Sequence, residues 1–276
     1  MAAAAVGQTA PLPTAQLIAT PPGLVRTALA NGLRAAQDTS HPMRYRLRKT
    51  SPRLTTTKEM IETQDGTVAM LVAVNDKPLT PDDLAKEQGR LQTLLNDPAK
   101  QHHRKQAEAE DTTRALKVLR VLPTAFLYTD AGPITAGTVT AEKFTFVPNP
   151  KFNPPDLETQ ALTEFRGEIW VEPVSAHVIH LEAHLQQDVD FGWGILGRLN
   201  KGGWISLEQA EVSEGVWRVV KFQMQMTGRV LIHTRTFDTT EDESHYEPVP
   251  AGLAYQQAIA MLRSGPSAAV PVPAGR

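Results

Sequence analysis

Alternating apolar and polar residues run through most of the chain, which is the pattern of β-strands with one buried and one exposed face. The clearest run is Val178–Phe191, where the odd positions from Ile179 onward are mostly apolar and the even positions are polar. Val216–Met226 repeats the pattern later in the chain. We therefore expect a sheet with an apolar face that must be covered.

Further strands are expected where the same two-residue period is bounded by turn residues. Gln64-Asp65-Gly66 favours a hairpin, and the charged run Glu241-Asp242-Glu243 indicates a solvated turn. The strand candidates are Met43–Lys49, Leu54–Thr63, Thr67–Val74, Phe126–Tyr128, Val139–Val147, Phe165–Val171, Trp204–Val212 and Arg229–Phe237.

Helical patterns flank these strands. Thr80 and Asp97 each precede a proline, and both residue types cap the free amides at the start of a helix. The segment Gln101–Thr113 is almost wholly polar, so we expect it to stand in solvent or to contact a partner. The expected helices are Gly23–Gln37, one from Pro81, one from Pro98 to about Leu122 where Pro123 stops it, and Leu253–Leu262.

The composition changes at the two ends of the chain but not within it. Residues 1–22 are rich in Ala, Pro and Thr and are expected to form a flexible arm, and residues 263–276 a disordered Pro/Ala tail. Residues 23–262 then form a single domain with a helical insertion at 81–122. The small residues of Met1–Gln8 are similar to the end of a signal peptide, which favours a mature exported protein over a plain disordered terminus.

Overall charge and residue usage exclude several classes of protein. The chain has 28 Lys and Arg against 30 Asp and Glu, a net charge of -2, so it is not a polyelectrolyte for nucleic acid. No apolar run approaches the ~20 residues of a membrane helix, and no transmembrane segment is expected. The chain has 0 cysteines, which excludes disulfides and thiolate chemistry.

Two motifs resemble ligand sites but lack the context that such sites need. Gly192–Gly197 has the glycine spacing of a dinucleotide site, but Lys201-Gly202-Gly203 and another strand follow it in place of a helix. We interpret it as a loop in which Trp193, Ile195 and Leu196 form an apolar plug. Of His177, His180 and His184, only the last two share a strand face, and their Cα atoms would lie ~13 Å apart, too far for one metal ion.

No catalytic constellation is present in the sequence. Asp188 and Asp190 share a strand face, but outward polar residues around them explain that equally well, and no carboxylate pair is set apart as acid and base. A nucleophile elbow, a P-loop and a zinc-protease motif are absent. The sequence therefore predicts no catalytic residue, no metal site and no cofactor, and we expect a protein that is not an enzyme.

Arg44, Arg46 and Arg48 form a basic stripe on one side of a predicted strand. Guanidinium groups in a row suit contact with phosphate or a lipid headgroup. A strand whose solvent-exposed face carries charges for solubility also has basic residues at every second position. Both interpretations stay open, and the three arginines are candidates for an anion or headgroup site.

Two stretches resemble a known group of bacterial envelope proteins. One is Gly167-Glu-Ile-Trp-Val-Glu172 followed by Val178-Ile-His-Leu-Glu-Ala-His-Leu185. The other runs from Gly203-Trp-Ile-Ser-Leu-Glu-Gln-Ala-Glu-Val212 through Gly215-Val-Trp-Arg218 to Ser244-His-Tyr-Glu-Pro248. Over most of residues 40–262, this succession resembles the outer-membrane lipoprotein-sorting (LolA/LolB-like) superfamily, in particular its uncharacterised envelope branch.

The resemblance implies an α+β fold, in which helices pack across the concave face of a strongly curved antiparallel sheet, an open half-barrel. In the carriers of that family the concave cavity takes up acyl chains. The helical pair at 81–122 is an insertion that these carriers lack.

The leading interpretation is a periplasmic or secreted binding protein without catalytic activity. It would hold an apolar ligand, a lipid acyl chain or a lipoprotein anchor, between sheet and helices. The alternative is a structural or protein-interaction module of the cell envelope with a closed core and no ligand, in which helix 98–122 meets a protein partner. The candidate lining residues of the cavity are Ile179, Leu181, Leu185, Val220, Phe222, Met224 and Met226, although a methionine stripe also fits a plain core.

Overall fold

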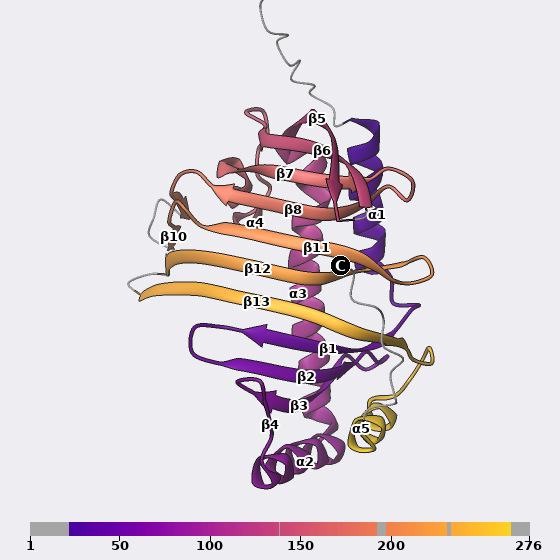
Figure 1. The fold of residues 1–276 in the computed structure, drawn as a ribbon. Coiled ribbons are helices and arrows are strands. Elements are labelled where there is room, and N and C mark those ends of the chain that lie inside the picture. Colours follow the sequence, from indigo (N-terminus) through magenta and orange to yellow (C-terminus); the bar gives the residue numbers. More distant parts are fainter. Residues whose placement is uncertain (1–21, 138, 192–196, 231–232, 266–276) are drawn as a thin grey trace, which may run out of the picture.

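One antiparallel sheet of 13 strands organises the molecule (Figure 1). The structure is a computed structural model that describes residues 22–265 apart from 138, 192–196 and 231–232. The strand order is β4-β3-β2-β1-β13-β12-β11-β8-β7-β6-β5, and β10 and β9 extend it beside β12. The strands are β1 (Met43–Thr50), β2 (Thr55–Ile61), β3 (Val68–Val74), β4 (Lys77–Pro78), β5 (Phe126–Ala136), β6 (Val139–Pro148), β7 (Phe165–Glu172), β8 (His177–Leu185), β9 (Val189–Phe191), β10 (Gly197–Leu199), β11 (Trp204–Ser213), β12 (Val216–Val230) and β13 (His233–Pro248).

The sheet is open, because β4 and β5 form its two ends among the described residues. The expected α+β fold with an open antiparallel sheet is therefore confirmed. The helices are α1 (Gly23–Gln37), α2 (Pro81–Asn96), α3 (Pro98–Ala125), α4 (Leu157–Gln160) and α5 (Tyr255–Arg263), with a 3-10 helix at Ala161–Glu164.

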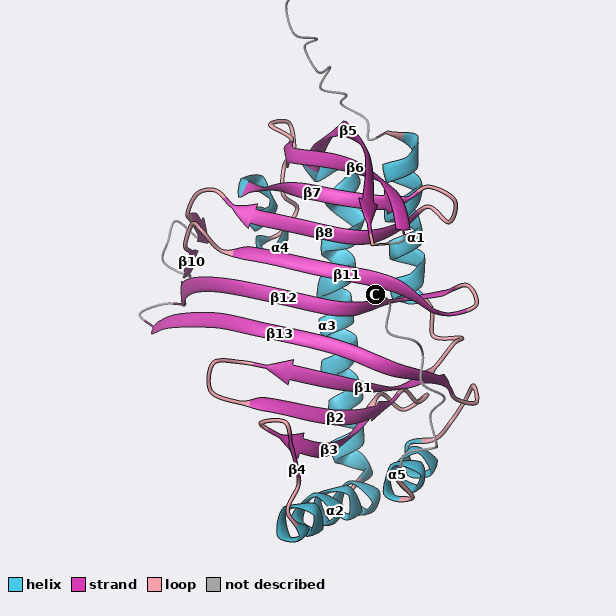
Figure 2. Cartoon of the chain, viewed as in Figure 1, coloured by secondary structure: helices cyan, strands magenta, loops and turns pink. Residues whose placement is uncertain are grey.

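Helix α3 crosses one face of the sheet almost from end to end (Figure 2). It has 28 residues, which corresponds to about 42 Å at the rise of an α-helix. The strands from β3 to β6 are eight steps apart in the order, or roughly 38 Å at the usual strand spacing. The helix is therefore long enough to bridge the sheet from β3 to β6.

The main core lies on this α3 face, at the β5–β8 end of the sheet. Helix α1 contributes Val25, Ala28 and Leu29, whose spacing puts them on one side of the helix. The last turns of α3 contribute partly buried Val118, Val121 and Leu122. The buried residues of the main core are Val25, Ala28, Leu29, Ala125, Phe126, Tyr128, Phe144, Phe146, Leu162, Phe165, Ile169, Val171, Val178, Ala183, Leu185, Val189 and Met226.

A second core lies on the opposite face of the sheet. Paired residues of neighbouring strands point to the same face. Phe222 lies on the α3 face with Met226 and pairs with Glu241 of β13. Glu241 pairs with Lys49 of β1, and Lys49 pairs with Thr56 of β2, so Thr56 also points to the α3 face. Ile61, an odd number of residues further along β2, therefore points away from α3. Helices α2 and α5 cover it there, so these two helices do not pack across the α3 face, to which the sequence analysis assigned all helices. The second core contains Ile61, Val68, Met70, Leu91, Leu94, Leu253, Tyr255, Ala258, Ile259 and Leu262.

The helix starts agree with the sequence, but the end of α3 does not. Thr80 and Asp97 cap α2 and α3 as expected, each accepting a backbone N–H three residues on. Pro123, expected to end α3, lies inside its last turn, and the helix continues to Ala125. The exposed carbonyl groups there have other partners: the Tyr128 hydroxyl donates to the Leu122 carbonyl at 3.1 Å, and Asn149 Nδ2 donates to the Thr124 carbonyl at 2.8 Å.

Two strand predictions also need correction. The run 241–243 is not a turn but lies inside β13, where Glu241 faces Lys49 across the ladder with an Nζ–Oε1 distance of 2.6 Å. Opposite charge on the neighbouring strand makes such a run compatible with a sheet. The strand expected over 178–191 is two strands, because β11 begins opposite His184 and leaves the residues after Leu185 without a ladder partner on that side.

Candidate ligand-binding site

The middle of α3 is polar and exposed to solvent. Residues 102–115 are all exposed, whereas Gln101 before them is buried and Leu116 after them is partly buried. A helix packed on a sheet buries every third or fourth residue, and this stretch of 14 residues, about 21 Å, buries none. We call residues 102–115 the strap.

Hydrogen bonds anchor the first turns of α3 to the β2–β3 hairpin. Gln101 Nε2 donates to the Asp65 carbonyl at 2.7 Å, and Lys105 Nζ donates to the Gln64 carbonyl at 2.8 Å. The Glu108 carboxylate accepts both the backbone N–H and the hydroxyl of Thr67, at 2.8 and 2.6 Å. The expectation that the polar half stands in solvent or meets a partner is thus only partly right, since one side of its start binds this hairpin.

Beneath the strap, the α3 face of the central strands is apolar and partly exposed. Leu181, Leu207 and Phe222 form a row across β8, β11 and β12, because Leu207 pairs with both of the others. Ile205 and Met224 form the next row, on the same face. All five side chains are partly exposed. Leu181, Ile205 and Met224 also pack against the main core. The inner face, as we call these five residues, therefore offers the apolar surface that this packing leaves exposed.

Towards β1 and β13 the same face becomes polar. The rings of Tyr45 and Tyr246 stack with centroids 5.3 Å apart, and the Tyr246 hydroxyl donates to the Glu243 carboxylate. Burial, followed by the carboxylates of Glu243, Glu62 and Glu108, raises the pKa of Tyr45. Since Glu108 belongs to α3, this polar cluster lies under the same helix as the inner face. The site as a whole is apolar on one side and polar on the other.

Two carboxyl groups of the polar cluster have raised pKa values. Burial raises the pKa of Glu243 to about 7, although the hydrogen bond from Tyr246 acts in the opposite direction. Burial also raises the pKa of Glu62, which accepts the Met43 backbone N–H at 2.9 Å. Arg218 lies 3.9 Å from the Glu62 carboxylate and offsets part of the negative charge.

The raised pKa of Glu243 predicts that stability falls as the pH rises. Because the folded state holds this proton more tightly than the unfolded chain, whose glutamates titrate near 4.5, the stabilising contribution is full below that pH and is lost as the pH passes 7. We expect Glu243→Gln to match the wild type in urea denaturation at acidic pH and to exceed it by about 1–3 kcal/mol at pH 8. The exposed Glu110→Gln is the control, and an equal difference at both pH values for Glu243→Gln would contradict the assignment.

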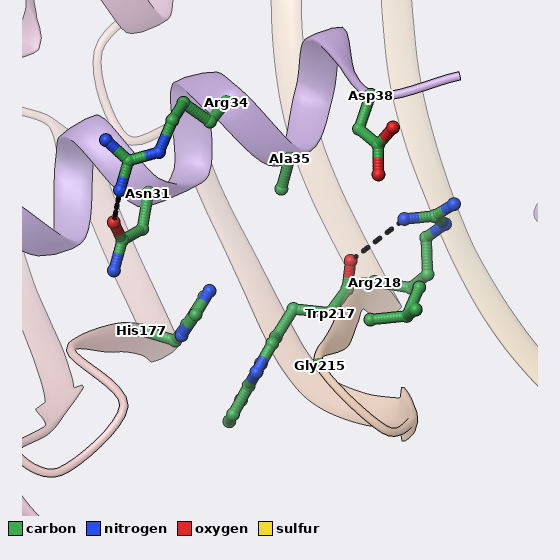
Figure 3. Close-up of a pocket in the computed structure, with 9 residues that line it drawn as sticks. Asn31, Arg34, Ala35, Asp38, His177, Gly215, Trp217 and Arg218 are labelled. Carbon is green, nitrogen blue, oxygen red and sulfur yellow. Dashed lines mark hydrogen bonds between the residues drawn. The ribbon is translucent and has the colours of Figure 1, made fainter. Parts of the chain in front are cut away.

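A pocket of about 420 Å³ opens at the polar end of the site, between α1 and the start of β12 (Figure 3). Arg34 and Asp38 line it from the α1 side, and Trp217 and Arg218 from β12. The His177 ring stacks on Trp217 with centroids 4.4 Å apart. Burial lowers the pKa of His177, and its Nδ1 atom has no hydrogen-bond partner among the described residues. Arg218 connects this pocket to Glu62 and so to the polar cluster.

The structure divides the predicted lining residues into three groups. Leu181, Phe222 and Met224 belong to the inner face, while Leu185 and Met226 are buried in the main core. The two others lie where the pairing register shifts, Ile179 opposite β7 and Val220 opposite β11. Such a bulge interrupts the two-residue alternation, and Val178 is the buried core residue beside the first shift.

Sequence analysis did not name several residues of the site. Ile205 and Leu207 alternate with polar neighbours in a strand that was expected, so their period was a sufficient signal. The polar cluster left no such signal, because Tyr45, Glu62 and Glu243 meet only where β1 lies beside β13 in the sheet.

The basic stripe lies on the face opposite α3, and carboxylates pair with each arginine. Arg46 Nη2 lies 2.7 Å and Arg44 Nε 3.5 Å from the Glu59 carboxylate, and Arg48 Nε lies 2.8 Å from Asp76. Arg44 is also buried. These contacts favour the interpretation of a charged strand face over a headgroup site, and they do not join the stripe to the inner face.

The remaining sequence motifs lie apart from the inner face. Residues 192–196 of the glycine-rich run lie outside the described residues, as does the apolar plug expected there. His180 stacks on Trp170 with centroids 4.4 Å apart, and His184 pairs with Glu182 at 2.6 Å. Among the described residues, no helix combines the length and apolar character that crossing a membrane requires.

Comparison with known proteins gives one structural likeness. No protein-family model and no curated protein sequence matches the chain. A solved domain from Vibrio parahaemolyticus, described as an outer membrane lipoprotein-sorting protein, aligns over 86% of this chain and 98% of its own length, with 8% identity and a TM-score of 0.34. A likeness at this TM-score carries no inference about the function of this chain.

Proposed function

We propose that this chain is a non-catalytic binding protein that holds an apolar ligand, such as a lipid acyl chain, between the strap and the inner face. The observation that carries the proposal is the strap itself, which crosses the apolar inner face without burying a residue. Partly exposed apolar side chains gain about 25 cal/mol for each Å² that a ligand covers. A polar helix above them keeps the empty state soluble.

The polar cluster and the pocket at its end suit the polar part of an amphipathic ligand. Arg218, Glu62 and the hydroxyl of Tyr246 lie at that end of the same face. A fatty acid or a lipoprotein anchor, with its chain on the inner face and its head towards β1, satisfies both halves of the site. The protein would act in the bacterial cell envelope, periplasmic or secreted.

Native mass spectrometry of the protein purified from its own cells, followed by organic extraction, tests this function. We expect an added mass that disappears on extraction and matches a lipid in the extract. A bare polypeptide mass, together with no uptake of an added fatty acid, would contradict it.

A second candidate is an interaction module that binds a protein through α3. The exposure of all residues in the strap favours it, because a polar helix surface of this length is available to a partner. In that case the strap would become protected from hydrogen exchange when the partner binds, while the inner face would take up no lipid.

A further inference from the structure

A small apolar groove lies at the end of the sheet where β9, β10, β12 and β13 meet. Its volume is about 260 Å³, and Phe191, Leu199, Leu157 and Phe237 line it. Phe191 and Leu199 pack against the main core, whereas Leu157 and Phe237 are 48% and 49% exposed. We call this end of the sheet the tip.

Three arginines also line the groove at the tip. Arg198 binds Asp190 at 2.6 Å and Asp188 at 3.3 Å, so its charge is balanced. Arg229 and Arg235 are exposed and form no ion pair within the described part of the chain, and the segments outside it contain no aspartate or glutamate. Arg229 is near enough to Asp190 to help lower the pKa of that carboxyl group. The tip therefore carries two exposed guanidinium groups that form no direct ion pair within the described residues.

The strand register places Arg229 and Arg235 on opposite faces of the sheet. Arg235 lies two residues from Phe237 and points to the same face, the α3 face, where Phe237 pairs with Met226. Arg229 pairs with Thr234 and points to the opposite face. Asp238, next to Phe237, also points away from the α3 face. At this edge of the sheet, apolar side chains lie between a cation on one face and a cation on the other. Such an edge can bind a flat anionic surface.

We propose that the tip docks on a membrane that contains anionic phospholipid. Exposed aromatic and aliphatic side chains enter the boundary between headgroups and acyl chains, while guanidinium groups beside them bind phosphate. Such a surface needs no matched pocket on a partner, which suits a narrow edge with only two protruding apolar side chains. The same edge leads along the α3 face towards the inner face, through Phe237 and Met226. This docking does not require a ligand under the strap. Membrane docking can therefore fail while fatty-acid uptake is found, and fatty-acid uptake can fail while membrane docking is found.

Flotation with lipid vesicles tests the proposal. We expect the wild-type protein to float with phosphatidylcholine vesicles that contain about 30 mol% phosphatidylglycerol, to stay behind with pure phosphatidylcholine, and to be released by high salt. Arg229→Gln/Arg235→Gln should bind the anionic vesicles about 30-fold more weakly, since each basic residue contributes about 1 kcal/mol at such a surface. Phe237→Ser should weaken binding while keeping the salt dependence.

A matched control removes two exposed positive charges elsewhere. Arg26→Gln/Lys77→Gln alters α1 and the edge strand β4, and should bind like the wild type. Equal flotation with both kinds of vesicle, or an equal loss in this control, would overturn the proposal. Retention on polyglutamate resin without vesicle binding would also overturn it and assign the tip to an acidic protein. Circular dichroism of each variant confirms that surface substitutions leave the fold intact.

Discussion

Gly167→Ala is expected to lower the free energy of unfolding by about 3 kcal/mol or more. Gly167 lies in β7 and pairs with Phe146 on one side and Ala183 on the other. A Cβ atom at this position would lie 1.9 Å from the Glu182 carbonyl oxygen and 2.9 Å from the Ala183 Cα atom. Both are backbone atoms of β8, so the two strands would have to separate.

Separating the two strands is costly, because core side chains lie beside Gly167. Phe165 and Ile169, two residues to either side of Gly167, are buried in the main core, and moving them would open cavities. Gly89→Ala in α2 is the control, since its added methyl group would meet no atom within 4 Å apart from the neighbouring backbone of its own helix, and it should raise stability by up to about 1 kcal/mol. Urea denaturation measures both changes, and a loss below about 1 kcal/mol for Gly167→Ala would contradict the packing of β7 on β8.

Phe222→Glu is expected to weaken the uptake of a fluorescent fatty acid by about 100-fold or more, from the cost of bringing a carboxylate against an acyl chain. Phe222 pairs with Leu207 on one side and Glu241 on the other, so the substitution places a charge at the β12 end of the inner face. Because Phe222 is partly exposed in the empty protein, the variant is expected to remain folded. A fluorescence titration measures the change in affinity.

Val174→Glu provides the matched control. It makes a related apolar-to-acidic substitution at a side chain that is 93% exposed, in the turn between β7 and β8, and should leave uptake unchanged. If Phe222→Glu fails to fold, Leu207→Gln tests the same row of side chains without adding a charge. Wild-type affinity in folded Phe222→Glu would remove the inner face from the ligand site.

Local periodicity predicted the strands well where the pattern depends on one segment alone. Met43–Lys49 and Trp204–Val212 differ from β1 and β11 by a single residue at one end. The register shifts at Ile179 and Val220 were missed because a bulge depends on the neighbouring strand, which local sequence does not specify. The acidic run in β13 was missed for a similar reason, since its partner Lys49 lies far away in the sequence.

The candidate site was predictable in part. The apolar alternation around Phe222 and Met224 indicated an apolar sheet face, and the polarity of Gln101–Thr113 indicated a helix that does not pack along its length. Their combination was not predictable, because it requires the position of α3 across the sheet. The polar cluster depends on β1 lying beside β13, a pairing between the two ends of the domain.

Photo-crosslinking of a bound fatty acid tests the central claim most directly. A fatty acid with a diazirine on its terminal carbon would be bound, irradiated and located by peptide mass spectrometry. We predict crosslinks to the inner face, at Leu181, at Ile205 and Leu207, or at Phe222 and Met224, and their loss when unlabelled fatty acid is in excess. Crosslinks confined to the tip or to the face opposite α3, or none that unlabelled fatty acid competes away, would contradict a ligand site beneath the strap.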